Sequence, residues 1–306
     1  WPSGASWALG IDWTELYYTP GGADEKIRMI QAGFGRPLQA GTYYIGVIND
    51  ASDSPATYRV VSRAIAAAGA PILVKDLAFS GGVTPATALP AREAEYYKVV
   101  VPAGVKSWKL RLRQTAGESE LLVARGTIPN VGATVWKPAA VQSSAGRRLQ
   151  RLGNEHFVLL PEGPDTTLHA DTYYVAVVSE GINPDRNQSR IGGGSSEFVL
   201  ESQGDLQVEN LGELGAAGLS RTPQLEGGEI RAYRFQVLEG TPAIEVELAD
   251  RVGSLVAAVA AGTQLPSPVW WRGWNEAFYG IEGGAWPGSA IGNAFVTIPN
   301  PAPGEY

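Results

Sequence analysis

The sequence holds few side chains of the kinds that catalyse reactions or bind metals. It contains no cysteine, which excludes thiolate nucleophiles and cysteine-based metal sites, and its only histidines are His156 and His169. A metal site or an acyl-transfer triad needs a histidine close to further ligands or to a nucleophile. Neither histidine recurs in the internal repeats of the chain, and we expect both at surface or strand-edge positions. The sequence therefore predicts that the protein is not an enzyme.

Two loops gather side-chain oxygens of the type that calcium prefers. One holds Asn49, Asp50 and Asp53, and the loop at the equivalent place in the next repeat holds Asp185. The spacing matches no fixed calcium motif, and Asn and Asp are also ordinary turn residues. Calcium binding is thus one interpretation of these loops and simple turns are the other. No other cofactor is expected.

Nine tryptophans are available for packing or for contacts with a partner. Three of them recur at equivalent places in the repeats and predict core positions: Trp7, Trp136 and Trp270. Large rigid rings can also stack on sugars or anchor a protein partner. The candidates for such contacts have no repeated counterpart: Trp271, Trp274 and Trp286.

Composition limits the classes of partner. Lys and Arg number 24 against 31 Asp and Glu, and the resulting net charge of -7 argues against a nucleic-acid surface, which needs clustered cations. No run reaches the roughly 18 apolar residues that cross a bilayer, so membrane insertion is not expected. Because the chain begins at Trp1 rather than methionine, we expect a processed product or part of a longer protein.

The elements that position these residues are predicted to be short strands. The chain has 38 Gly and 21 Pro, which interrupt the sequence too often for long helices to dominate. Apolar and polar residues largely alternate in 97–101, 108–113 and 233–237, as strands with one solvated face require. This period of two predicts antiparallel sheets, and the frequent turn residues favour β-sandwiches.

Internal repeats divide the chain. Residues 40–47 match 170–177 without a gap, and a third copy begins at 303–306. In the same way, residues 95–102 pair with 231–238. We therefore predict the C-terminal part of a first β-sandwich repeat, a complete second repeat, and a third repeat truncated at its closing strands. The respective ranges are 1–65, 71–202 and 206–306, with joints at 64–70 and 202–205.

The repeats resemble the bacterial pre-peptidase C-terminal domain family. The similar features are a Tyr-x-Val strand before Val-Pro-Ala-Gly at 97–104, the strand at 119–123, and the Thr-Tyr-Tyr strands at 42–44 and 172–174, and the second repeat carries all of them. The resemblance implies tandem antiparallel jelly-roll-like β-sandwich modules, located outside the cell or on its surface. It also implies an accessory, binding or spacer role.

These observations predict a non-catalytic extracellular structural or adhesive array, part of a surface protein or fibre. The alternative is an accessory region of a secreted hydrolase such as a peptidase, which would bind a polysaccharide or protein substrate. The expected partners are neighbouring copies of the chain or further repeats, and possible further ligands are a polysaccharide or an extracellular protein. The incomplete end repeats have two interpretations: the chain is a piece of a longer array, or its ends exchange strands between copies.

Overall fold

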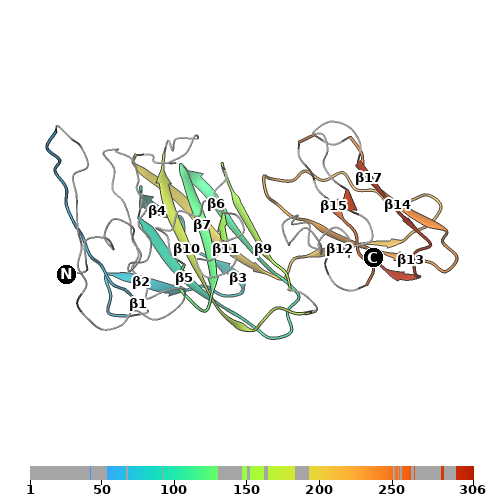
Figure 1. The fold of residues 1–306 in the computed structure, drawn as a ribbon, viewed down its shortest axis with the longest axis horizontal. Coiled ribbons are helices and arrows are strands. Elements are labelled where there is room, and N and C mark those ends of the chain that lie inside the picture. Colours follow the sequence, from blue (N-terminus) through green and yellow to red (C-terminus); the bar gives the residue numbers. More distant parts are fainter. Residues whose placement is uncertain are drawn as a thin grey trace, which may run out of the picture.

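A computed structural model describes the chain at residue 42 and over 54–66, 68–91, 93–129, 147–149, 152–161, 165–182, 193–250, 252–253, 255, 257–262, 265, 284–285 and 294–306. These residues form strands and connections without a helix, which confirms the all-β prediction for this part of the chain. Among them, accordingly, no helix has the length and apolarity needed to cross a membrane. Figure 1 shows the strands gathered in two lobes.

The first lobe contains two sheets. The first sheet has the order β1-β2-β5-β10-β7-β8: β1 Ile65–Ala66, β2 Ile72–Asp76, β5 Ala94–Val101, β10 Asp171–Gly181, β7 Glu118–Arg125 and β8 Arg147–Leu149. The second sheet has the order β3-β11-β6-β9, and β4 also pairs with β11: β3 Ser80–Val83, β11 Ser195–Gly204, β6 Trp108–Ala116, β9 Glu155–Leu159 and β4 Thr87–Pro90.

The two sheets enclose one hydrophobic core, so this lobe is a β-sandwich. The first sheet contributes residues such as Val99 and Val175, and the second contributes Trp108 and Phe198, all of them fully buried. The Trp108 ring makes edge-to-face contacts with Phe157 and Tyr173, at centroid distances of 5.7 and 5.4 Å. The core therefore forms where the inward faces of the two sheets meet.

Alternation along the strands follows the prediction for one face of each sheet. In β6, Trp108, Leu110 and Leu112 are buried, and the intervening basic residues are partly exposed. In β5, Val99 and Val101 are buried on either side of Val100, which is 63% exposed. The period of two thus reports the pleat of a sheet that packs on one side.

The expectation of one solvated face is wrong for part of the first sheet. Tyr96, Leu122 and Ala176 point away from the central core, yet they are buried in a cluster of their own. The strand β10, at the middle of this sheet, is buried at nearly every position. A strand covered on both faces has a nearly continuous apolar sequence, which is why its alternation is weak.

The sequence predicted antiparallel sheets, but not all of the strand pairs are antiparallel. The pairs β1–β2 and β2–β5 are parallel. After β2 the chain crosses to the second sheet, where β3 and β4 pair with β11, and then returns to the first sheet as β5. Parallel neighbours need a crossover connection of this kind, whereas antiparallel neighbours can be joined by a short hairpin.

The second lobe has fewer described strands. The strand order in its largest sheet is β12-β13-β18, and the pairs β14–β17 and β15–β16 complete it: β12 Val208–Glu213, β13 Ala232–Val237, β18 Gly304–Glu305, β14 Ala243–Leu248, β17 Ala294–Pro299, β15 Ala257–Ala258 and β16 Gly284–Ala285. The pair β12–β13 is parallel and the pair β13–β18 is antiparallel. The core of this lobe consists of Val237, Ile244, Val259, Ile298 and Tyr306.

The predicted joints are not free linkers. Residues 202–204 lie inside β11, so the strand continues beyond the predicted boundary at Ser202. Of the Ala-rich joint, Ile65–Ala66 forms β1 at the edge of the first sheet. The repeat prediction also matched 43–47 with 173–177. The latter range lies in β10, between β5 and β7, while 43–47 lies outside the described residues.

Gly117 forms the turn between β6 of the second sheet and β7 of the first sheet, and this turn lies against Gly181 of β10 and Ser196 of β11. Gly117 has φ +65°, and a Cβ there would lie 2.4 Å from the Gly181 carbonyl oxygen and 3.1 Å from Ser196 Cα. Gly126, after β7, has a similar φ of +70° and nothing within 4 Å of a Cβ. The two positions share the left-handed conformation and differ in the space around them.

We predict that Gly117→Ala destabilises the first lobe much more than Gly126→Ala. The left-handed conformation costs each alanine about 1–2 kcal/mol, and the clash with backbone atoms adds roughly 2 kcal/mol or more at position 117. Urea unfolding followed by tryptophan fluorescence measures both variants. Equal losses of stability would show that the close approach of β10 to this turn is wrong.

Candidate functional site

The sequence-predicted ligand and contact residues fall outside the part of the chain that the structure describes. This holds for the calcium candidates Asn49, Asp50, Asp53 and Asp185, and for the contact candidates Trp271, Trp274 and Trp286. Calcium binding and the tryptophan contacts therefore stay predictions. Among the described residues, no group of three or more His, Asp or Glu side chains is arranged to hold a metal ion.

The two histidines have different environments. The His169 side chain is 58% exposed, and its Nε2 lies 3.2 Å from Asp165 Oδ2, an ordinary surface contact. His156 lies on the edge strand of the second sheet, as one of the two expected positions, but its side chain is only 2% exposed and so is not at the surface. His156 lies on β9 and meets the loop between β12 and β13, which belongs to the second lobe. This histidine marks a polar junction between the lobes.

Sheet register brings the first-lobe residues of this junction together. In the β6–β9 pair, Arg111 lies directly opposite His156, so their side chains are cross-strand neighbours. Asn154 precedes β9, and its Oδ1 accepts a hydrogen bond of 2.9 Å from the Gln114 backbone N–H. That bond turns the Asn154 Nδ2 toward the second lobe. Three hydrogen-bond donors thus converge from β6, from β9 and from the residue before β9.

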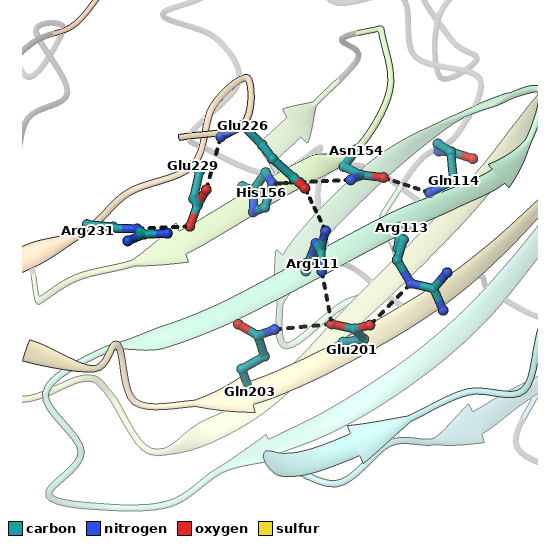
Figure 2. Close-up of polar contacts among 10 residues, drawn as sticks. All are labelled: Arg111, Arg113, Gln114, Asn154, His156, Glu201, Gln203, Glu226, Glu229 and Arg231. Carbon is teal, nitrogen blue, oxygen red and sulfur yellow. Dashed lines mark hydrogen bonds and ion pairs between the residues drawn. The ribbon is translucent and has the colours of Figure 1, made fainter. Parts of the chain in front are cut away.

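Glu226 of the second lobe is the acceptor for all three donors. Its Oε2 lies 2.8 Å from Asn154 Nδ2 and 2.8 Å from His156 Nε2, and its Oε1 accepts from Arg111 Nη2 at 2.8 Å. Because an ionised carboxylate only accepts, the imidazole donates from Nε2. Figure 2 shows the Glu226 loop arching over β9 and β6 with its carboxylate between these groups. We call Arg111, Asn154, His156 and Glu226 the junction cluster.

A tight turn holds Glu226 in place. The Glu229 backbone N–H donates to the Glu226 carbonyl oxygen at 3.1 Å, and the Glu226 N–H donates to Glu229 Oε2 at 3.0 Å. Gly228, inside the turn, has φ +81°, a conformation that side chains rarely adopt. Arg231 Nε lies 3.5 Å from Glu229 Oε1. The acidic side chain is therefore presented by a loop that hydrogen bonds within the turn hold in shape.

Further ion pairs extend the cluster along the second sheet. Glu201 on β11 lies 3.5 Å from Arg113 Nε and 4.0 Å from Arg111 Nη1, and Gln203 Nε2 donates to its Oε2 at 3.1 Å. Arg111 thus faces one carboxylate from its own sheet and one from the other lobe (Figure 2). The side chains linked in this way come from β9, β6, β11 and the second-lobe loop.

These donors lower the pKa of Glu226. The hydrogen bond from Asn154 has the largest effect, burial opposes it, and His156 and Arg111 lower the pKa further, to about 2 from 4.5. The pKa of Glu229 is also lowered: burial raises it, but the Glu226 N–H and nearby cations outweigh that effect. A carboxylate with a pKa this low is a weak base, since general bases work best with a pKa near the working pH. Its chemistry is that of a fixed anion.

A second contact fixes the chain between the lobes. Asp205 Oδ1, just after β11, accepts from the backbone N–H groups of Lys106 and Ser107 at 3.1 and 2.9 Å. The Ser107 hydroxyl lies 3.2 Å from the same oxygen, and it accepts from the Leu206 N–H at 2.8 Å. Ser107 is 1% exposed and Leu206 is 7% exposed. The chain therefore leaves the first lobe through a buried hydrogen-bonded joint.

Sequence reasoning missed the junction cluster. Glu226 is separated from Arg111, Asn154 and His156 by 115, 72 and 70 residues. No motif links residues so distant, and Glu226 itself lies in a turn of ordinary composition. The alternation in 108–113 indicates a strand at Arg111, but it does not show which loop covers that strand.

Comparison with protein-family models finds no match for this chain, and comparison with curated proteins finds none either. The resemblance to the pre-peptidase C-terminal domain family therefore stays a prediction. The function of the chain is argued below from its own residues and geometry.

We predict that Glu226→Gln lowers stability at pH 7 and has no effect near pH 2. The pKa of Glu226 is depressed in the folded protein, so its contribution is fully present above pH 4.5 and is lost as the pH falls through about 2. The Glu226 side chain is 44% exposed, which limits the loss at pH 7 to about 0.5–1 kcal/mol. Urea unfolding across this pH range measures it.

The matched control is Glu213→Gln, which removes an exposed carboxylate of β12. The control should leave the unfolding midpoint unchanged at both pH values. A loss for Glu226→Gln that persists at pH 2, or an equal loss for both variants, would contradict the role of the ionised carboxylate.

Proposed function

We propose that the protein is a non-catalytic, extracellular structural or adhesive array, in which tandem β-sandwich modules hold contact surfaces at a fixed spacing. The observation that carries this proposal is the junction between the lobes. Glu226 and Asp205 together accept hydrogen bonds from five residues of the first lobe. A linker that served only to tether two modules would need none of them.

The order of strand pairing supports a tandem arrangement. In the first lobe, β2 pairs parallel with β5, and β5 pairs antiparallel with β10. In the second lobe, β12 pairs parallel with β13, and β13 pairs antiparallel with β18. The pair β14–β17 corresponds in the same way to β6–β9. Strands β12 and β13 follow β2 and β5 by about the repeat offset of the sequence, so the second lobe is interpreted as a further copy of the first.

The chemistry of the junction cluster supports a role without catalysis. His156 and Arg111 are both engaged with Glu226, and Glu226 is held as an anion by hydrogen bonds from within the protein. A carboxylate held in this way positions parts of a structure and is a weak base at neutral pH. The extracellular location rests on the resemblance to the pre-peptidase C-terminal domain family.

The proposed rigidity predicts one narrow distance distribution between the lobes. Because the chain has no cysteine, spin labels can be placed at two new cysteines. Suitable positions are Val83 on β3, 62% exposed, and Leu238 after β13, 46% exposed. The Asp205→Ala and Glu226→Ala substitutions together should broaden the distribution. A broad distribution in the otherwise unchanged chain would contradict a fixed spacing.

Absence of catalysis is tested with the purified chain. We expect no hydrolysis of peptide or glycan substrates, since no described repeat brings together a nucleophile, a base and an orienting group. The informative variant replaces both His156 and His169 by glutamine. Hydrolysis that survives this change would indicate a carboxylate site and overturn the proposal.

A further inference from the structure

A stretch of exposed chain leads into the first lobe. Residues 54–64 are exposed at every position, and residues 55–64 form neither strand nor helix. Figure 1 shows this stretch in blue, running into β1 at the end of the molecule away from the second lobe. Tyr58, Val60 and Val61 are 68%, 50% and 54% exposed. We call residues 54–64 the connector.

The backbone of the connector is open. Within the described part of the chain, no backbone group of residues 55–63 is hydrogen-bonded to another backbone group. The first such bond joins the Ile72 N–H to the Ala64 carbonyl oxygen at 3.2 Å. The composition of the connector favours an extended chain, because its proline lacks an N–H and its aromatic and β-branched residues prefer extended conformations.

A segment of this kind is what a protease can bind. Proteases hold their substrates as extended chains, whose backbone groups pair with the edge of the enzyme cleft and whose side chains enter pockets. Most of a folded chain resists cleavage because its backbone is already paired, so a site must first open locally. The connector needs no such opening, and exposed segments are the preferred places of proteolytic cleavage.

The two cations of the connector differ in their contacts. Arg63 is engaged, since its Nη2 lies 2.7 Å from Glu93 Oε2. Arg59 makes no ion pair or hydrogen bond with any residue that the structure describes. A guanidinium group without such contacts can enter the acidic pocket by which trypsin-like proteases select their substrates. Arg59 is therefore the side chain of the connector that such a protease would recognise.

The position of Arg59 within the connector also suits cleavage. Residues 57–62 surround the Arg59–Val60 bond, and all of them are exposed and outside any strand. After Arg63, in contrast, β1 begins at Ile65 and pairs with β2. A protease cleft holds residues on both sides of the bond that it cuts. The bond after Arg59 meets this requirement, whereas the bond after Arg63 adjoins the first sheet.

We propose that the connector is a processing site, at which a protease of trypsin-like specificity hydrolyses the peptide bond between Arg59 and Val60. The reaction consumes one water. The Arg59 carbonyl carbon gains the hydroxyl and ends as a carboxylate, and the Val60 nitrogen gains the proton and becomes a new amino terminus. Cleavage separates residues 1–59 from the two lobes. The proposal goes beyond the proposed function, whose own test is the distance between the lobes.

The cut leaves the lobes with a short, anchored end. Among the described residues, no strand and no buried core residue lies before Val60. Arg63 Nη2 donates to Glu93 Oε1 at 3.0 Å, and β1 pairs with β2 two residues further on. Hydrolysis after Arg59 thus removes no described contact of the two lobes.

The second lobe contains a comparison site. Residues 220–224 are also exposed and form neither strand nor helix, and they include Arg221. The Arg221 guanidinium is engaged, because Nε contacts Glu209 and Nη1 donates to the Ser220 carbonyl oxygen at 2.8 Å. Pro223, two residues after Arg221, offers no N–H to a protease. Exposure is similar at the two sites, and the contacts of the arginine differ.

Limited proteolysis of the whole chain with trypsin tests this proposal, read by mass spectrometry as the initial rate at which each new amino terminus appears. The terminus at Val60 should appear at least about tenfold faster than the terminus at Thr222, since cleavage of a folded chain follows the fraction of time for which a site is open. Arg59→Gln should lower the rate at Val60 by about a hundredfold or more, because a neutral side chain leaves the acid of the protease pocket unpaired.

Two variants serve as controls. Arg59→Lys keeps the positive charge and should be cut at a rate within about tenfold of that of the unchanged chain. Arg221→Gln should leave the rate at Val60 as it is. The proposal is overturned if the Val60 terminus appears no faster than the Thr222 terminus, which would show that the connector is covered. It is equally overturned if Arg59→Gln leaves the rate at Val60 unchanged.

Discussion

Complete burial of the Trp108 indole is the constraint on which the structure depends. A buried indole N–H must find an acceptor, because an unsatisfied donor costs about 1–3 kcal/mol. Trp108 Nε1 donates to Ser202 Oγ at 2.9 Å, and the Ser202 hydroxyl donates to the Phe79 carbonyl oxygen at 2.6 Å. Ser202 lies on β11 and Phe79 immediately precedes β3. One side chain thus ties β6, β11 and the β2–β3 connection together.

The position of the second lobe follows from the same constraint. Because Ser202 is fixed, the chain leaves β11 at a defined point, and Asp205 is placed beside the Lys106 and Ser107 backbone N–H groups. The joint at Leu206 then directs the second lobe toward the outer face of β6 and β9. Glu226 meets Asn154, His156 and Arg111 there. The buried joint sets the direction, and the partly exposed ion cluster holds the orientation that results.

The sequence predicted the layers better than the junction. The period of two in β5, β6 and β13 indicated strands with one inward face, and this is confirmed because the pleat alone determines it. The parallel β2–β5 pair and the buried outer face of the first sheet were not predicted, since both depend on which segments cover which strand. The joint at 202–205 has the polar composition of a linker, yet Ser202 and Asp205 accept hydrogen bonds within the fold and Gln203 donates one to Glu201. His156 was expected near the surface because the sequence does not show that a loop 70 residues away covers it.

Amide hydrogen exchange at the joint tests the central claim most directly, namely that the second lobe is tied to the core of the first. The account predicts that the Leu206 N–H, bonded to Ser107 Oγ, exchanges with a free energy of opening close to that of the Trp108 indole N–H. Both would then open only when the first lobe unfolds. Rapid exchange at Leu206 with a protected Trp108 indole would show that the lobes are joined by a linker that opens independently, and would contradict the account.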